Sequence, residues 1–137
     1  MNDVALFQYR TEYNGEVGSQ GEELIADYLS KTGVNFLREV KFDRLKFVTF
    51  DFFIPEYRLT IEFDGRQHFE VVDDFGDNEL KLIARRRFDK IKNRFIFGNN
   101  GRMIRVKYTE DIISVLKTKI EKHFGNDCKL LIDYVVL

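Results

Sequence analysis

A helix is predicted near the start of the chain from a capping signal followed by apolar residues at helical spacing. The tetrapeptide Ser19-Gln20-Gly21-Glu22 has the S-x-x-E pattern of a capping box, which opens a helix. Apolar residues then recur at positions 24, 25, 28 and 29, and Gly33 ends the pattern. Residues 1–18 show no such period, and we expect them to form an N-terminal extension.

After Gly33 the period changes from helical to extended. Three short runs rich in Phe, Val and Ile predict strands over residues 36–42, 47–54 and 58–64, which we interpret as an antiparallel meander. Helical spacing returns over residues 78–97 and 110–124, and a further strand is predicted over residues 103–107. The predicted order, α-β-β-β-α-β-α, indicates an α/β protein with a mixed sheet and helices packed on it.

The length of 137 residues fits a single domain, which we place at residues 19–137. The tail over residues 129–137 is apolar and β-branched, so it could add a last strand. Such a strand could complete the sheet of the monomer, which we favour, or pair with a second copy in a homodimer.

The net charge of −1 conceals two segments of opposite charge. Residues 81–107 contain ten Lys or Arg residues and one acid, Asp89, whereas residues 56–79 contain eight acids. Acidic and basic segments side by side suit a protein that holds metal ions and phosphates together. A solvated helix face is the alternative reading of the basic segment. Cys128 is the only cysteine, and there is no long apolar run, so we expect a cytoplasmic location away from membranes.

Acidic residues within apolar strands are the strongest chemical signal. Asp51 lies in Phe50-Asp51-Phe52-Phe53-Ile54, where an uncompensated charge would be costly and a cation would relieve it. Glu62 and Asp64 are two residues apart and project from one strand face, and His68 follows a turn at Gly65. Carboxylates suit Mg²⁺, or Mn²⁺ in its place, and the histidine suits proton transfer, as phosphodiester cleavage requires.

Each of these residues also has a structural interpretation. The histidine could be a hydrogen-bonded structural residue, and the Glu–Asp pair could form salt bridges. Glu22 could be only a helix cap, and Asp89 could pair with Arg85 or Arg86 on its own helix. Their joint occurrence around one sheet favours the functional interpretation, with Asp51, Glu62 and Asp64 as metal ligands.

Two segments resemble the core of a nuclease family. Phe50-Asp51-Phe52-Phe53-Ile54-Pro55-Glu56-Tyr57 and Ile61-Glu62-Phe63-Asp64-Gly65-Arg66-Gln67-His68-Phe69 are similar to the "FDF-x-P-x-Y…IE-x-DG-x-QH" pattern of PD-(D/E)xK nucleases. The branch they resemble is the phage-associated, homing-type EDxHD group, which is similar to the very-short-patch-repair endonuclease. The resemblance covers about residues 19–113 and implies a restriction-endonuclease-like core.

The resemblance implies a functional set made of a helix acid, a strand Asp, a His and a further Asp. By position these are Glu22, with Glu23 as the alternate, then Asp51, His68 and Asp89. Glu62, Asp64 and Gln67 fall in the most distinctive stretch and complete the candidate catalytic residues. Asp64 stands where the superfamily has a Lys, so His68, Gln67 or Lys92 must take over the roles of that Lys.

Together these features predict a Mg²⁺-dependent endonuclease that hydrolyses double-stranded DNA, in homing, repair or phage DNA processing. The alternative is a DNA-binding module on the same fold without catalysis, and a third interpretation has the acids pairing with the basic helix for structure alone. DNA-reading modules typical of homing enzymes are not visible in the sequence. The residues predicted to contact DNA are Arg66, Arg85, Arg86, Arg87, Lys90, Lys92 and Arg94.

Overall fold

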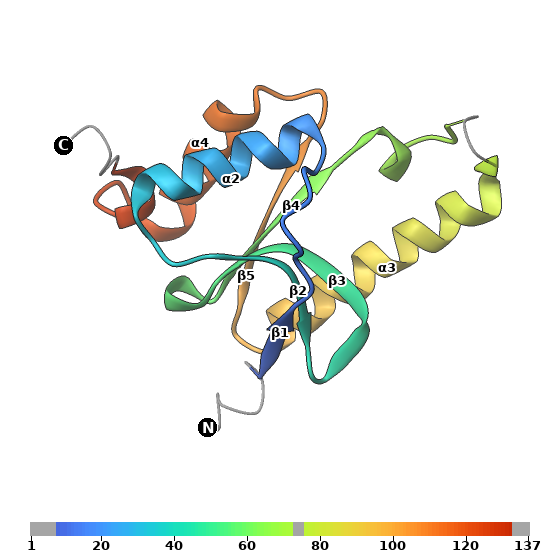
Figure 1. Ribbon diagram of the computed structural model, residues 1–137, viewed down its shortest axis with the longest axis horizontal. Coiled ribbons are helices and arrows are strands. Elements are labelled where there is room, and N and C mark those ends of the chain that lie inside the picture. The colour runs from blue at the N-terminus through green and yellow to red at the C-terminus, as the bar shows by residue number, and fades with distance from the viewer. Residues whose placement is uncertain (1–7, 73–75, 133–137) are drawn as a thin grey trace.

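The computed structural model describes residues 8–72 and 76–132, which form one mixed β-sheet with helices on both faces (Figure 1). The predicted α/β class is therefore confirmed. The strands are β1 (Tyr9–Thr11), β2 (Leu37–Phe42), β3 (Leu45–Ile54), β4 (Leu59–Asp64) and β5 (Arg102–Lys107). The helices are α2 (Gln20–Thr32), α3 (Glu79–Gly98) and α4 (Ile112–Phe124), and 3-10 turns cover Pro55–Tyr57, Arg66–His68 and Lys129–Leu131.

The five strands lie in the sheet in the order in which they occur in the chain. β2, β3 and β4 form the predicted antiparallel meander. β4 and β5 are parallel, and α3 makes the crossover between them. From α2 to α4 the order of helices and strands is the one predicted from the sequence.

Both faces of the sheet are covered, which explains why its central strands are almost continuously apolar. On one face Phe52 and Ile61 pack against α2 and α4. On the other face Phe50 and Phe53 pack in a second cluster that includes Ile96 of α3. In Figure 1 the C-terminal part of α3 lies on the sheet, while its N-terminal part extends beyond it. The first turns of α3 are therefore largely exposed to solvent, with Leu82 as their buried residue.

Local signals set the helix ends, and those at the two ends of α2 are the predicted ones. Ser19 and Glu22 form the reciprocal hydrogen bonds of a capping box at the start of α2, and Gly33 ends the helix at a φ of 76°, which glycine adopts without strain. Asn78 caps α3 and Asp111 caps α4. Among the described helices, none combines the length and apolar character that a membrane span requires.

The two ends of the described chain differ from the sequence interpretation in one respect each. β1 was not predicted, yet Tyr9–Thr11 pairs with β2 at the edge of the sheet. Its three residues are too few to show a period, so its pairing comes from β2. In the tail, Lys129–Leu131 forms a 3-10 turn where a strand was considered, and residues 133–137 lie outside the described part.

Candidate active site

β3 and β4 separate at Asp51, at a point that we call the strand fork. The backbone ladder between them ends at the pair Phe52–Ile61, after which β3 continues beside β2 and β4 beside β5. Carboxylates take over the hydrogen bonds that the ladder no longer provides. The amide of Asp51 donates to Glu62 Oε2 at 2.7 Å, and the amide of Phe63 donates to Asp51 Oδ2 at 2.8 Å. Both acids are therefore held at the fork by backbone contacts.

Negative charge at the strand fork is only partly neutralised. Glu62 is 2% exposed, and its Oε1 accepts a hydrogen bond from Lys92 Nζ at 2.7 Å. Burial still raises the pKa of Glu62, although Lys92 acts in the opposite direction. Burial and the neighbouring Glu62 carboxylate raise the pKa of Asp51 well above its usual range. Among the described ion pairs, Lys92 pairs with Glu62, and no pair joins Asp51 to a cation.

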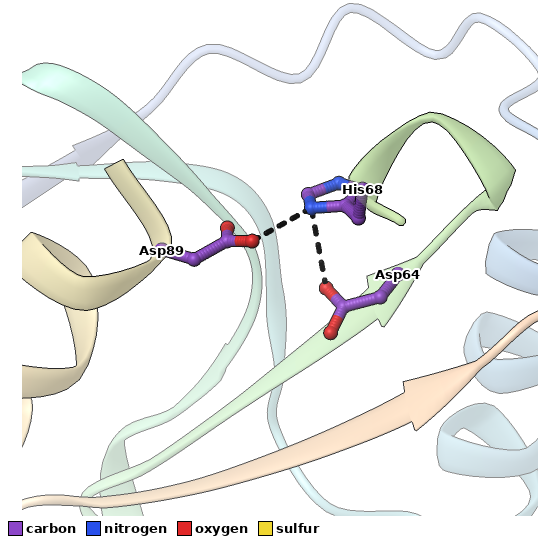
Figure 2. Close-up of side chains that lie close together, drawn as sticks. All are labelled: Asp64, His68 and Asp89. Atoms are coloured by element: carbon purple, nitrogen blue, oxygen red, sulfur yellow. Dashed lines mark hydrogen bonds and ion pairs between the residues drawn. The ribbon is translucent and has the colours of Figure 1, made fainter. Parts of the chain in front are cut away.

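A second cluster adjoins the strand fork and joins β4, the following turn and α3 (Figure 2). His68 Nδ1 lies 2.8 Å from Asp89 Oδ2 and 3.8 Å from Asp64 Oδ1. Ligand atoms of the three residues all lie within 4.8 Å of one another, a spacing at which they could share one cation. Asp64 is part of this cluster and lies on β4, the strand that also carries Glu62 of the strand fork.

The charges of this second cluster favour an imidazolium–carboxylate pair. The hydrogen bond to Asp89 raises the pKa of His68, against the effect of burial. Burial alone would raise the pKa of Asp89, but the hydrogen bond with His68 and the charge of Arg105 lower it. Burial raises the pKa of Asp64, although Arg105 and His68 oppose this. A histidine held by a carboxylate that raises its pKa suits proton transfer.

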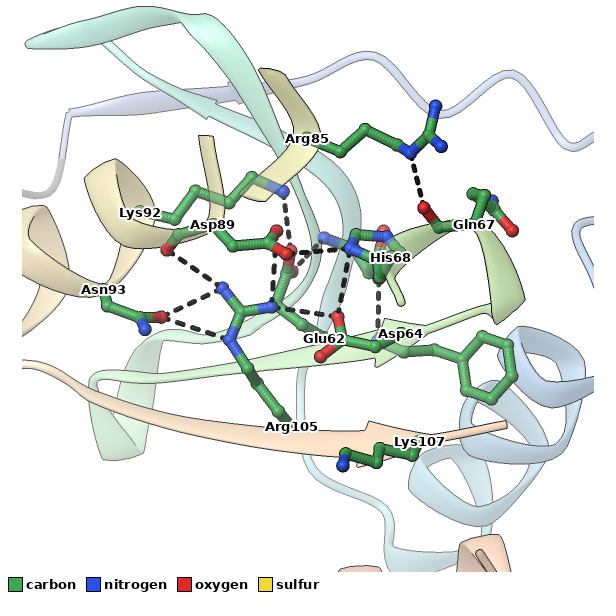
Figure 3. A network of polar contacts seen from close by, with 12 residues as sticks. Glu62, Asp64, Gln67, His68, Arg85, Asp89, Lys92, Asn93, Arg105 and Lys107 are labelled. Carbon is green, nitrogen blue, oxygen red and sulfur yellow. Dashed lines mark hydrogen bonds and ion pairs between the residues drawn. The ribbon is translucent and has the colours of Figure 1, made fainter. Parts of the chain in front are cut away.

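Arg105 of β5 links the second cluster to α3, and the sequence analysis did not assign it a role (Figure 3). Its guanidinium donates to Asp64 Oδ1 at 2.9 Å and to Asn93 Oδ1 at 2.9 and 3.1 Å, and it reaches the backbone carbonyl of Asp89 at 3.2 Å. The signal for Arg105 was available, because it is a charge between Ile104 and Val106 in an apolar strand. Asp51 on β3 shows the same signal, a charge within an apolar strand.

The two helix acids have different surroundings. Glu22 accepts the hydrogen bonds of the capping box, and its charge also contributes to raising the pKa of Asp51. Glu23 forms an ion pair with Arg38 at 2.6 Å and accepts from the amide of Gly18 at 2.8 Å. Glu22 is therefore the helix acid that acts electrostatically on the strand fork.

Gln67 and the basic residues predicted to contact DNA fall into two groups. Gln67 is exposed in the turn that carries His68, and its backbone carbonyl accepts a hydrogen bond from Arg85 Nε at 2.6 Å. Arg85 also forms a bidentate pair with Asp77 at 2.9 and 3.0 Å, so its charge is already used within the protein. Arg66 pairs with Glu70, Arg86 reaches the Phe69 carbonyl, and Lys92 binds Glu62. The exposed residues of this set with neither an ion pair nor a side-chain hydrogen bond among the described residues are Arg87, Lys90 and Arg94.

Five of the seven predicted catalytic residues are thus divided between two adjoining parts of one site, whereas Glu22 caps α2 and Gln67 is exposed. Asp51 and Glu62 lie at the strand fork, whereas Asp64, His68 and Asp89 form the second cluster. Of the three predicted metal ligands, Asp64 is the one that belongs to the cluster of closely spaced ligand atoms in the described chain. The sequence placed Asp89 in the functional set only through the resemblance. Its hydrogen bond to His68 joins residues from separate elements, which no local pattern reveals.

Part of the chain is similar in sequence to a viral protein. A stretch of 72 residues is 31% identical to "Uncharacterized protein 307L" of Invertebrate iridescent virus 6. The match covers 52% of this chain and 36% of the viral protein, so this chain spans about a third of that relative. No family model matches the chain. No solved structure matches it either.

Proposed function

We propose that the protein is a metal-dependent endonuclease that hydrolyses phosphodiester bonds of double-stranded DNA at the strand fork and the adjoining cluster. One observation carries the proposal. Four carboxylates and one histidine, which come from β3, β4, the turn after β4 and α3, lie close to two cations in adjoining polar contacts. Figure 3 shows three of the carboxylates, Glu62, Asp64 and Asp89, with His68, Lys92 and Arg105. A structural salt-bridge network would be expected to pair each carboxyl group with a cation, whereas this one leaves Asp51 buried, with a raised pKa and without an ion-pair partner among the described residues.

The donor set fits a hard divalent cation such as Mg²⁺, with Mn²⁺ as a substitute. Every carboxylate offers oxygen, the ligand type that these ions prefer. Asp51, Glu62 and Asp64 would hold the ion, with Asp89 close to Asp64. The raised pKa values of these three residues support the fit, because an added positive charge would relieve their burial. Bound there, the ion would supply Lewis-acid polarisation of a phosphate oxygen.

The side chains of the protein divide the remaining tasks. Asp89 holds His68 through Nδ1, which leaves Nε2 to accept or donate a proton during hydrolysis. Lys92 lies against Glu62 and supplies the positive charge that the superfamily Lys provides elsewhere, since Asp64 occupies that position here. Arg105 keeps Asp64 oriented and adds a second positive charge.

DNA would be held along α3 by its exposed cations. Arg87, Lys90 and Arg94 are exposed, and they lie on the same helix as Asp89 and Lys92. Contacts of this kind bind phosphates irrespective of sequence, so they position the duplex and carry no base specificity.

Supercoiled plasmid tests the proposal. The protein is incubated with plasmid in MgCl₂, MnCl₂ or EDTA, and His68→Ala is compared with His123→Ala, which removes the other histidine of the chain. We expect nicking or linearisation with either metal, none in EDTA, a loss in His68→Ala and full activity in His123→Ala. Equal activity of the two variants would contradict the assignment of the site. DNA affinity without cleavage of plasmid, mismatched or branched DNA would favour the non-catalytic binding module.

A further inference from the structure

Two exposed phenylalanines form a pair beside the candidate active site. Phe47 of β3 is 63% exposed and Phe88 of α3 is 43% exposed. Their ring centroids lie 6.1 Å apart with an angle of 55° between the ring planes. Most other phenylalanines of β3 are buried in the sheet, as the core requires. We call this pair the aromatic platform.

The aromatic platform borders the same hollow as the proposed catalytic residues. A hollow of about 290 Å³ is lined by both rings and also by His68, Asp89 and Lys92. Ligand sites begin at roughly this size, about 300 Å³. A molecule that rests on the rings would therefore lie next to the histidine that we propose transfers the proton.

The surroundings of the platform combine apolar surface with positive charge. Lys46 precedes Phe47 and Arg87 precedes Phe88; both cations are exposed, and neither has an ion-pair partner among the described residues. Beyond Phe88, a second hollow of about 480 Å³ continues along α3 and is lined by Arg87 and by apolar side chains such as Leu80 and Ile83. Flat apolar rings with cations on both elements match the bases and phosphates of a nucleic-acid strand.

We propose that the aromatic platform stacks an unpaired DNA base next to the scissile phosphate, so that the substrate is duplex DNA with a single-stranded segment or arm. This inference rests on the proposed nuclease function and narrows its substrate class. A paired base presents its face to its neighbours in the duplex, so only an unstacked base offers a face to Phe47 and Phe88. Stacking tolerates every base, because each has a π face.

Binding without metal tests the platform separately from cleavage. The affinity of a fluorescein-labelled DNA single strand is measured by anisotropy in EDTA, for wild type and for three variants of the full chain. Phe47→Ala removes one ring and Phe47→Trp keeps an aromatic surface. Phe97→Ala is the control, because it removes a 56% exposed ring that lies on α3, the helix of Phe88, and does not line the hollow.

We expect Phe47→Ala to bind the single strand roughly 5- to 150-fold more weakly, the range of ~1–3 kcal/mol per stacked base. Phe47→Trp should bind as wild type or more tightly, and Phe97→Ala should be unchanged. Unchanged binding by Phe47→Ala would overturn the proposal. An equal loss on a fully paired duplex would overturn it too, and so would a shift of Phe47→Ala from dimer to monomer in ultracentrifugation, which would show that a second copy covers the rings.

Cleavage then separates this inference from the proposed function. In Mg²⁺, a forked duplex with a single-stranded arm is compared with a blunt duplex of the same sequence. Faster cleavage of the fork by wild type, with the preference lost in Phe47→Ala while blunt-duplex cleavage persists, supports the platform. Equal cleavage of both substrates by wild type would refute the platform and leave the nuclease function standing. Metal-free binding that depends on Phe47, without any cleavage, would refute the nuclease function and with it this substrate assignment.

Discussion

Arg105 is the cation on which the second cluster of the site depends, so Arg105→Met should destabilise the fold strongly. The guanidinium side chain is 20% exposed, and it contacts Asp64, whose side chain is 8% exposed, as well as Asn93 and the backbone of Asp89. Methionine has a similar reach but no charge. The substitution therefore leaves Asp64 buried without its partner and Asn93 without its donor.

The magnitude follows from burial. Removing one partner of a fully buried ion pair costs ~3–5 kcal/mol, and partial exposure at Arg105 reduces this to about 2–4 kcal/mol. For a domain of this size 1 kcal/mol corresponds to roughly 4 °C, so the melting temperature should fall by about 8–16 °C. Urea unfolding followed by circular dichroism measures the change in the free energy of unfolding directly.

The matched control is Arg102→Met on the same strand. The Arg102 side chain donates to the His123 carbonyl and lies 4.9 Å from the ring centre of Phe124, but the residue is exposed. Its loss should cost less than about 1 kcal/mol. The reasoning about the cluster is refuted if the two variants lose the same free energy of unfolding.

Three further predictions concern the rest of the fold and the DNA surface. Gly21→Ala should lower the free energy of unfolding in urea by roughly 1–2 kcal/mol, although alanine favours helices, because a Cβ there would meet the Phe63 ring at 2.3 Å. Arg85 lowers the pKa of Asp77 from 3.8 to about 2, so wild type should be more stable than Asp77→Asn at neutral pH. A carboxyl group whose pKa is lower in the folded protein stabilises the fold at pH values above its pKa in the unfolded chain. The advantage of wild type should therefore vanish as the pH falls from about 4 to about 2, as measured by urea unfolding at each pH. The last prediction replaces the exposed cations Arg87, Lys90 and Arg94 of α3 with alanine. The slope of log affinity for duplex DNA against log salt concentration, measured by anisotropy, should decrease in magnitude by up to about 3. An unchanged slope would show that DNA binds elsewhere.

The sequence predicted the elements of the fold well because its signals are local. The capping box at Ser19 and the cap at Asn78 fix helix starts through side chains a few residues away. The apolar runs of β3 and β4 reflect burial on both faces of the sheet. β1 could not be found in this way, because a three-residue edge strand is defined by its partner.

The site was predicted less completely, because its contacts join distant elements. Asp51 was identifiable as a charge inside an apolar strand, and Arg105 carried the same signal. The sequence could not show that Lys92 forms an ion pair with Glu62, or that Arg85 forms one with Asp77. Both cations belong to a run of basic residues that looks uniform along the helix. Only the packing of α3 on the sheet and on the turn after β4 distinguishes the inward cations from the exposed ones.

The most direct test of the proposed active site compares Asp51→Asn with Asp43→Asn on supercoiled plasmid across a Mg²⁺ titration. The Asp51→Asn substitution keeps the size of the side chain and an acceptor for the Phe63 amide but removes the charge, whereas Asp43 lies exposed in the turn between β2 and β3. We predict that Asp43→Asn cleaves like wild type. Asp51→Asn should lose at least about 100-fold in rate, the equivalent of ~3 kcal/mol of transition-state stabilisation, and still bind DNA in EDTA. Metal-dependent cleavage by Asp51→Asn at the wild-type rate would contradict a catalytic centre at the strand fork.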